Sequence, residues 1–332
     1  DEMEGRETGT SGQKKAAAYI QEQFRALGLK PIDAAGDYQQ YFPLYQDTLV
    51  KSLVNINGNI GKFGADYLYT ISQNENKDLT GKNLVFVGYG IDDPKYSDYD
   101  KTNVKGKIVV FFSGEPKQDD KYTISGTSFM SDWSFSNNKK LKTAKEKGAI
   151  GAIIINGFQE NFTEKEIARN IKTPLNFRQS TSTVILNNII LSHAFAKKIF
   201  GAKFDHFLTT AKALQLFNKK SFLAKNAKAS LVYQKQQNIE YASNVLGSIE
   251  GTDKKDEYVF ITAHYDHLGK HDGKIYYGAD DDGSGTCGVI EMAEAFAKAA
   301  KEGFRPRRTI VFMTVSGEEK GLWGSEFYSD HP

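Results

Sequence analysis

Apolar residues recur at three- and four-residue steps near the start of the chain, which predicts an amphipathic helix over residues 12–27. Thr10 followed by Gln13 has the spacing of a capping box at its beginning. Gly28 directly after the stripe is a typical C-terminal stop. The positions that form the stripe are Ala17, Ile20, Phe24 and Leu27.

The pattern changes after about residue 49, where short apolar runs separated by turn residues replace the helical periodicity. A helical stretch over 139–147 leads through Gly148 into the third of these runs. This region holds no cluster of histidines, cysteines and carboxylates, so we interpret it as a separate, mostly β module. The runs that we expect to be strands are 84–87, 108–112 and 153–155.

Beyond residue 235 the pattern is α/β, with strands expected at 244–249, 258–262 and 309–315 and a helix at 286–301. Near-continuous apolar strands that alternate with helices favour a sheet buried on both faces. We therefore expect residues 1–47 and 236–332 to form one α/β domain of mixed sheet flanked by helices. Residues 48–235 would be an insertion within it.

Composition restricts the class of protein. The 332 residues are 39% apolar and 25% charged, as in a globular protein, and the net charge of +2 gives no basic excess for a nucleic-acid partner. Cys287 is the only cysteine, which excludes a disulfide scaffold, and we interpret it as packing within a helix. No apolar run reaches the ~18 residues of a membrane span. The polar first residues contain no signal peptide, so we expect a processed N-terminus.

Three polar clusters occupy the ends of the apolar elements in the last third of the chain. Residues 263–267 follow one strand, residues 278–285 precede the helix, and residues 316–319 follow the next strand. Ligands of open α/β sheets bind outside the carboxyl ends of the strands. We therefore expect the three clusters to meet in space.

The residue types in these clusters suit zinc, which binds histidine nitrogen and carboxylate oxygen. Two dications about 3.5–4 Å apart need a bridging carboxylate, and three adjacent aspartates repel one another unless a cation compensates them. Of two adjacent glutamates at a strand end, one can bind metal while the other takes a proton from water.

Each cluster taken singly has a plainer explanation. His264 could be a hydrogen-bonded core histidine, the aspartates an acidic loop or a calcium site, and Glu318 and Glu319 a solvated pair. Their order and their placement at element ends favour a metal site. We interpret His267 and His271 as uninvolved loop residues.

The three clusters resemble the front motifs of the co-catalytic zinc aminopeptidases, a family that includes glutamate carboxypeptidase and the transferrin receptor. The matching segments are His264-Tyr265-Asp266, residues 278–285 and residues 318–325. Residues 4–10 are similar to the start of that peptidase domain. Segments 87–90 and 104–109 resemble the protease-associated domain that many members carry as an insertion.

The resemblance implies a fold of the zinc-exopeptidase type and a site with two zinc ions. His264 would bind one zinc ion, Glu319 the other, and Asp281 would bridge them. Glu318 would be the general base, and Asp266 would orient His264. The family also has a further aspartate about 25–30 residues after the glutamates and a distal histidine.

The chain ends at Pro332, 13 residues after Glu319, so neither further ligand can be present, and His331 is not assigned to the distal role. We expect the chain to be truncated at its C-terminus, to bind zinc poorly and to be inactive alone.

For the whole protein we expect an aminopeptidase that hydrolyses N-terminal peptide bonds, located outside the cytoplasm as the resemblance implies. The alternatives are a carboxypeptidase of the same family, a catalytically dead receptor-like protein, and an acyltransferase such as a glutaminyl cyclase. Fold analogy does not decide among them.

Overall fold

The computed structural model describes residues 2–31, 35–118, 120–156, 161–179, 185–202, 204, 223 and 226–332. It divides into two compact units. The first contains Asp1–Tyr45, Leu175–Gln179 and Ile239–Pro332, and the second contains Gln46–Pro174 and Ser180–Asn238. The N-terminal part of the first unit ends at residue 45 instead of the expected 47, and its C-terminal part begins at residue 239 instead of 236. It also includes residues 175–179, which the sequence prediction placed wholly in the insertion.

The first unit begins with the predicted amphipathic helix, α1 (Ser11–Leu27), which buries its apolar stripe and packs against α8 (Ser284–Lys301). Gly28 ends α1 in the left-handed conformation, with φ of 79°. The predicted capping box is wrong. Thr10 accepts no capping hydrogen bond, and Gln13 turns into the core, where its amide donates to the hydroxyl of Tyr265.

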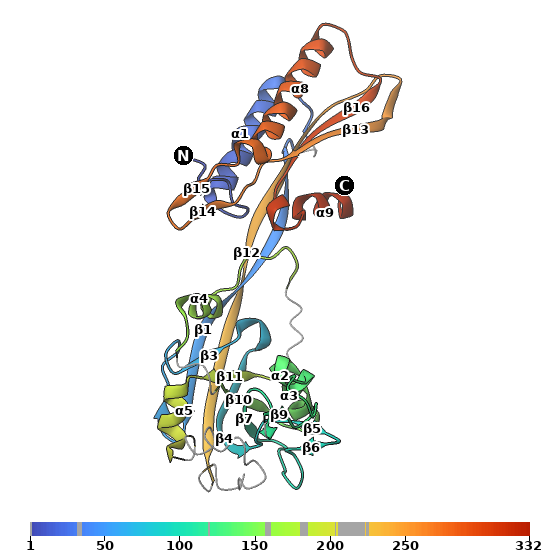
Figure 1. Cartoon of the computed structure of the whole chain (residues 1–332). Coiled ribbons are helices and arrows are strands. Elements are labelled where there is room, and N and C mark those ends of the chain that lie inside the picture. Colours follow the sequence, from blue (N-terminus) through green and yellow to red (C-terminus); the bar gives the residue numbers. More distant parts are fainter. Residues whose placement is uncertain are drawn as a thin grey trace. The chain divides into compact units, whose positions relative to one another are not determined.

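The sheet of the first unit has the order β13–β16–β12, with β13 (Lys254–His264) parallel to β16 (Arg308–Val315). β16 is antiparallel to the last residues of β12 (Lys228–Ile249), and α1 and α8 pack beside this sheet (Figure 1). The remaining elements are β14 (Gly269–His271), β15 (Lys274–Tyr276), η3 (Ala279–Gly283), η4 (Glu318–Lys320) and α9 (Trp323–Asp330).

Burial of this sheet differs from the expectation. β16 is buried along nearly its whole length, whereas Tyr258, Val259 and Phe260 of β13 are 61%, 42% and 42% exposed. The physical reason is position, because β13 is the last strand in the order of the described sheet. A strand at an edge has a neighbour on one side only, so its apolar side chains are covered less well.

In the second unit the sheet order is β12–β4–β7–β10–β11–β3. β4 (Lys77–Phe86), β7 (Ile108–Phe112), β10 (Gly151–Ile155) and β11 (Asn188–Leu191) run parallel, while β12 and β3 (Tyr67–Tyr69) are antiparallel to their neighbours. The three predicted strands and the helix before the third one, α3 (Asn137–Glu146), are therefore confirmed.

Apolar side chains cover both faces of this second sheet and form two separate clusters of buried residues. β1 (Gln39–Ile56) pairs with β12, and both strands belong in part to each unit. The other described elements are β2 (Asn59–Ile60), η1 (Ile71–Gln73), β5 (Asp92–Asp93), β6 (Tyr96–Ser97), β8 (Lys117–Gln118), β9 (Lys121–Tyr122), α2 (Asp132–Phe135), α4 (Glu164–Ile171) and α5 (His193–Phe200).

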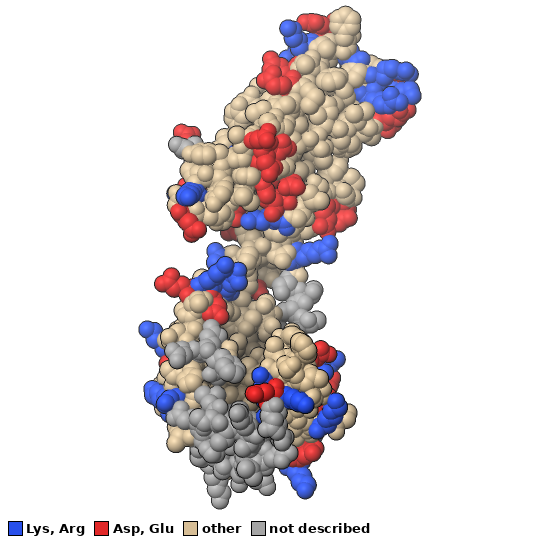
Figure 2. Space-filling view, in the orientation of Figure 1, with Lys and Arg blue, Asp and Glu red and all other residues tan. Residues whose placement is uncertain are grey.

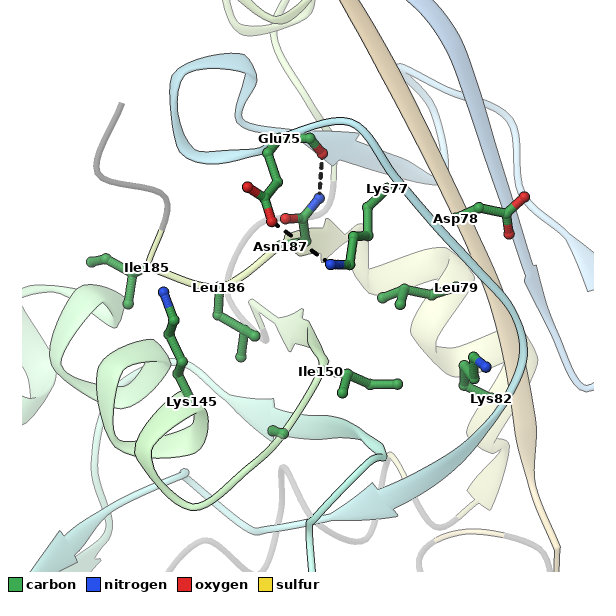
Figure 3. Close-up of a pocket in the computed structure, with 11 residues that line it drawn as sticks. Glu75, Lys77, Asp78, Leu79, Lys82, Lys145, Ile150, Ile185, Leu186 and Asn187 are labelled. Carbon is green, nitrogen blue, oxygen red and sulfur yellow. Dashed lines mark hydrogen bonds and ion pairs between the residues drawn. The ribbon is translucent and has the colours of Figure 1, made fainter. Parts of the chain in front are cut away.

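A cavity of about 460 Å³ lies in the second unit at the amino ends of β10 and β11 (Figure 3). The first residues of β4, which precede its pairing with β7 at Leu84, form one side of the cavity. Leu79, Ile150 and Leu186 line it, with lysines at its margin. The residues that line it include no histidine or cysteine, so this cavity does not resemble the predicted metal site.

The face drawn in Figure 2 carries both acidic and basic side chains. At the start of β16, Arg307 pairs with Asp253 at 2.7 Å and Arg308 pairs with Glu257 at 2.6 Å. Among the described helices, none has the length and apolar character needed to cross a membrane.

Candidate metal centre

The pairing of β13 with β16 brings the first and third polar clusters together. The two strands are parallel, and their last residues, His264 and Val315, are directly paired. The residues that follow each strand therefore emerge at the same edge of the sheet. η3, which carries the three aspartates, contacts β13 and leads into α8. The expected convergence of the three clusters is confirmed by this geometry.

His264 lies at the meeting point. Its Nε2 is 3.0 Å from Oδ1 of Asp281 and 3.8 Å from Oε2 of Glu318. Its Nδ1 is 3.1 Å from the main-chain oxygen of Asp266, so that carbonyl accepts a hydrogen bond from Nδ1–H and Nε2 is the nitrogen that faces Asp281 and can bind a metal. The side chain of His264 is 11% exposed, which fixes the ring while keeping one edge open.

Asp281 and Asp282 make different contacts in the loop before α8. Asp282 accepts hydrogen bonds from the main-chain N–H groups of His264, at 3.2 Å, and Gly285, at 3.0 Å. It therefore joins the end of β13 to the start of α8, and each of its oxygens already accepts a hydrogen bond. Asp281, linked to Asp282 by a cis peptide bond, keeps a side chain that is 68% exposed and faces His264. The middle aspartate is thus the one whose carboxylate remains open.

Asp266 is fully buried, and its carboxylate accepts hydrogen bonds from the hydroxyl of Thr8 at 2.7 Å and from the N–H of Glu318 at 3.2 Å. Its Oδ1 is 3.7 Å from Nδ1 of His264, which is within ion-pair range but beyond a hydrogen bond. Burial raises the pKa of Asp266, although these donors partly oppose the shift. The side chain therefore acts on His264 mainly through its charge and through the loop that it anchors.

Charge also sets the protonation of His264. Burial opposes the charged imidazolium, but the carbonyl of Asp266 and the carboxylates of Asp266 and Glu318 outweigh that cost, so the pKa of His264 is raised overall. The surrounding field is negative, which attracts a cation whether it is a proton or a metal ion.

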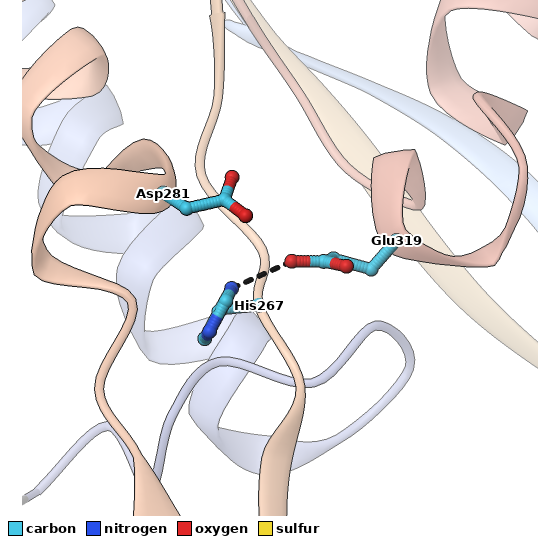
Figure 4. A group of neighbouring side chains, drawn as sticks. All are labelled: His267, Asp281 and Glu319. Atoms are coloured by element: carbon cyan, nitrogen blue, oxygen red, sulfur yellow. Dashed lines mark ion pairs between the residues drawn. The ribbon is translucent and has the colours of Figure 1, made fainter.

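A second histidine enters the centre. Nδ1 of His267 lies 2.6 Å from Oε1 of Glu319, and His267, Asp281 and Glu319 each place a ligand atom within 4.8 Å of the others. Figure 4 shows the three side chains pointing toward one another from the loop after β13, from η3 and from η4. The interpretation of His267 as an uninvolved loop residue is therefore corrected. Its spacing of three residues from His264, just past a strand end, was the available signal.

The donor set in this group fits a metal cation. Nδ1 of His267 and Oε1 of Glu319 are both buried, and despite their short separation neither atom makes a hydrogen bond of suitable direction. Buried polar atoms normally have a partner. Imidazole nitrogen with carboxylate oxygen is a ligand combination typical of zinc. The residues therefore fit the metal that the sequence predicts.

Two other residues lie apart from this group. His271 ends β14 in the exposed β14–β15 hairpin, so it lies in a strand and not in the expected loop, and its Nε2 is 2.7 Å from the carbonyl of Leu268. Cys287 is exposed, so its interpretation as a packed helix residue is wrong. α8 buries Thr286, Val289, Ala293 and Ala297, and position 287 falls off that stripe.

Comparisons with known proteins agree with this picture. Residues 244–332 match the model of peptidase family M28, and residues 73–185 match that of the PA domain. Among curated relatives, a probable glutamate carboxypeptidase of Arabidopsis thaliana is 34% identical over 96 residues, covering 29% of this chain and 13% of the relative. An aminopeptidase of Rattus norvegicus is 37% identical over 90 residues, covering 27% and 11%.

Solved structures give more distant matches. An aminopeptidase from an Aneurinibacillus strain is 16% identical, with a TM-score of 0.40, covering 98% of this chain and 62% of its own. A zinc aminopeptidase from Bacillus subtilis is 20% identical, with a TM-score of 0.36 and coverage of 99% and 62%. The matches thus span less than two thirds of the length of these relatives.

Proposed function

We propose that the whole protein is a zinc exopeptidase that removes N-terminal residues from peptides. The basis is that this chain belongs to peptidase family M28 and carries a PA domain. One observation supports this most directly. Residues from three distant parts of the sequence converge at one strand edge, with His264 at 3.0 Å from Asp281 and His267 at 2.6 Å from Glu319.

The proposed ligands follow from the side chains that remain open. His264 would hold one zinc ion through Nε2, Glu319 the other through a carboxylate oxygen, and Asp281, which lies near both histidines, would bridge the pair. When bound, zinc supplies Lewis acidity, which lowers the pKa of water and polarises a peptide carbonyl. Nδ1 of His267 would bind the same ion as Glu319, because neither of these two buried atoms has a hydrogen-bond partner.

Glu318 is the proposed general base. It precedes the ligand Glu319 on the same turn, and its Oε2 lies 3.8 Å from His264, so its carboxylate reaches the open edge of the site. In this role an oxygen of Glu318 accepts a proton from the attacking water and returns it to the leaving amine. Its own N–H donates to buried Asp266, which holds the turn in place.

The carboxypeptidase alternative has support of a specific kind, because matching relatives carry the names of both activities. The residues of the centre prepare water and a carbonyl for reaction and do not select which end of a peptide binds. The receptor-like alternative is disfavoured by the presence of all four metal- and proton-handling side chains. An extracytoplasmic location, proposed on the family resemblance, would be tested by cell fractionation.

The test uses the whole protein, loaded with zinc, and two matched substrates. One is a peptide with a free N-terminus and an amidated C-terminus, and the other has an acetylated N-terminus and a free C-terminal glutamate. We expect cleavage of the first only, with loss of activity on chelation and recovery with zinc. Cleavage of the second only would establish the carboxypeptidase, and cleavage of neither by zinc-loaded protein would contradict the proposal.

A further inference from the structure

We propose that Arg6 is a positioning residue of the metal centre, which holds the aspartate loop against the end of β13. The inference rests on the proposed function, because the two segments that Arg6 joins carry the proposed zinc ligands.

The guanidinium of Arg6 donates three hydrogen bonds to main-chain carbonyls of two separate segments. Nε donates to Tyr265 at 2.6 Å, next to His264. Nη1 donates to Tyr277 at 2.7 Å and Nη2 to Gly278 at 3.0 Å, at the entry to the loop of Asp281. One rigid planar group therefore fixes the separation of the two segments. A lysine ammonium in this place would be a single point donor and could not span the same three oxygens.

The residues beside Arg6 bind the remaining parts of the centre. The carboxylate of Glu7 pairs with Lys320 at 2.9 Å, directly after Glu319. The hydroxyl of Thr8 donates to Asp266. The main-chain oxygen of Arg6 accepts from the N–H of His267 at 3.3 Å. All three polar clusters are thus attached to one short stretch of chain, which makes that stretch part of the framework of the site.

The backbone of this stretch is held in an unfavourable form. Arg6 has φ of 57°, a left-handed conformation that is uncommon for a residue with a side chain. Gly5 precedes it with φ of 74°, and a Cβ there would lie 2.5 Å from the carbonyl oxygen of Tyr276. Such conformations persist where surrounding contacts determine them, and they cluster at functional sites. The close approach lets the guanidinium reach both segments.

Burial supports the same assignment. It lowers the pKa of Arg6, but an arginine stays charged in proteins, so the cost of desolvation has to be offset by its partners. Three carbonyls and the nearby carboxylate of Asp266 supply that compensation. A group held this way is costly to remove, because the carbonyls lose their donor together.

The experiment compares Arg6→Ala and Arg6→Lys with Arg25→Ala in the 332-residue chain. Arg25 is an exposed arginine on α1 that pairs with Glu22, so its loss controls for removal of a positive charge. Amide hydrogen exchange is measured without metal at residues 264–267 and 278–283. We expect both Arg6 variants to exchange there about tenfold faster or more, with α8 and β16 unchanged and Arg25→Ala like the wild type.

Zinc titration of the whole protein provides the readout that a merely structural residue would not move. We expect Arg6→Ala to bind zinc about 10–100-fold more weakly, as when partners of metal ligands are removed, and millimolar guanidinium ion to restore part of the affinity. Unchanged exchange in Arg6→Ala, or full protection in Arg6→Lys, would overturn the inference. If the wild-type whole protein bound no zinc under any condition, the proposed function would fail, while the exchange data would still decide the role of Arg6.

Discussion

The hydroxyl of Thr8 donates a 2.7 Å hydrogen bond to Oδ2 of Asp266, although 258 positions separate the two residues. Both side chains are buried, and the other oxygen of Asp266 accepts from the N–H of Glu318. The bond therefore ties the N-terminal segment to the loop that carries His264 and to the turn that carries the two glutamates.

Thr8→Val removes the donor while keeping the shape of the side chain. We expect a loss of about 1–3 kcal/mol in the free energy of unfolding, because a buried carboxylate oxygen is left without a partner. Urea denaturation of the 332-residue chain at pH 7 measures it. Thr8→Ser is the matched control, since it keeps the hydroxyl. Equal stability of the valine and serine variants would contradict the importance of the bond.

Substitutions of Glu318 and Glu319 should have different effects in the whole protein. Glu318→Gln should keep its zinc but lose at least about 10²–10⁴-fold in turnover, because the amide cannot accept the proton. Glu319→Gln should instead lower the zinc content, because a carboxylate ligand is replaced by a neutral group. Metal analysis and a peptidase assay on the same samples test both. Near-normal activity of Glu318→Gln would show that the roles are reversed or wrong.

His267 is expected to matter for metal binding, unlike its neighbour His271. His267→Ala removes the nitrogen that lies 2.6 Å from Glu319, so we expect zinc affinity to fall by about 10–100-fold. His271→Ala is the matched control, because that ring is in the exposed hairpin. Competition with a chromogenic chelator measures both affinities. Equal zinc affinities in the two variants would show that His267 takes no part in the metal centre.

A buried lysine should make the stability of the second unit depend on pH. Lys140 on α3 is 0% exposed, and its ammonium donates to the carbonyls of Phe112, at 3.1 Å, and Gly114. Burial lowers the pKa of Lys140 from 10.5 to about 7. Between these two values the unfolded chain binds a proton that the folded chain does not, so the free energy of unfolding rises with pH across this window.

Lys140→Met should remove this contribution to the pH dependence of the free energy of unfolding. Between pH 7 and 9, the slope of the free energy of unfolding against pH should be smaller in this variant than in the wild type. We expect the two slopes to differ by about 1 kcal/mol per pH unit, whatever the variant's absolute stability. The matched control is Lys142→Met, an exposed lysine on the same helix. Urea denaturation at several pH values gives the slopes. An identical slope in the Lys140 and Lys142 variants would show that Lys140 stays protonated in the folded state.

The sequence allowed much of the framework to be predicted because periodicity and strand-end position are local signals. The helix at α1, the strands β7 and β10, and the convergence of the three clusters were of this kind. Residue types at strand ends then indicated the chemistry, since parallel strands such as β13 and β16 deliver their following residues to one edge.

The features that sequence reasoning missed depend on contacts between distant segments. Gln13 has the spacing of a capping residue, but the hydroxyl of Tyr265 offers it a buried partner, and only the folded chain shows this. His267 looked like a loop residue because its partner, Glu319, is distant in sequence. Arg6 and Thr8 gave no signal of a role, since their partners follow 258 or more residues later.

The edge strand of the first unit should promote self-association. In the part of the chain that the structure describes, β13 has one neighbouring strand, β16, and it carries exposed apolar side chains at Tyr258, Val259 and Phe260. An exposed apolar edge strand offers unpaired backbone groups and apolar contact area to another molecule. We therefore expect the 332-residue chain to associate increasingly with concentration.

Val259→Lys should weaken this association, because a charge on an edge strand disfavours the pairing of one edge with another. We expect sedimentation velocity to show a smaller associated fraction at equal concentration, and a smaller fluorescence gain of a dye that binds apolar surface. Val50→Lys is the matched control, since Val50 is 61% exposed but lies on β1, away from this edge. If both lysine variants reduced association equally, net charge and not the β13 edge would be its cause, and a chain that stayed monomeric without either change would contradict the prediction.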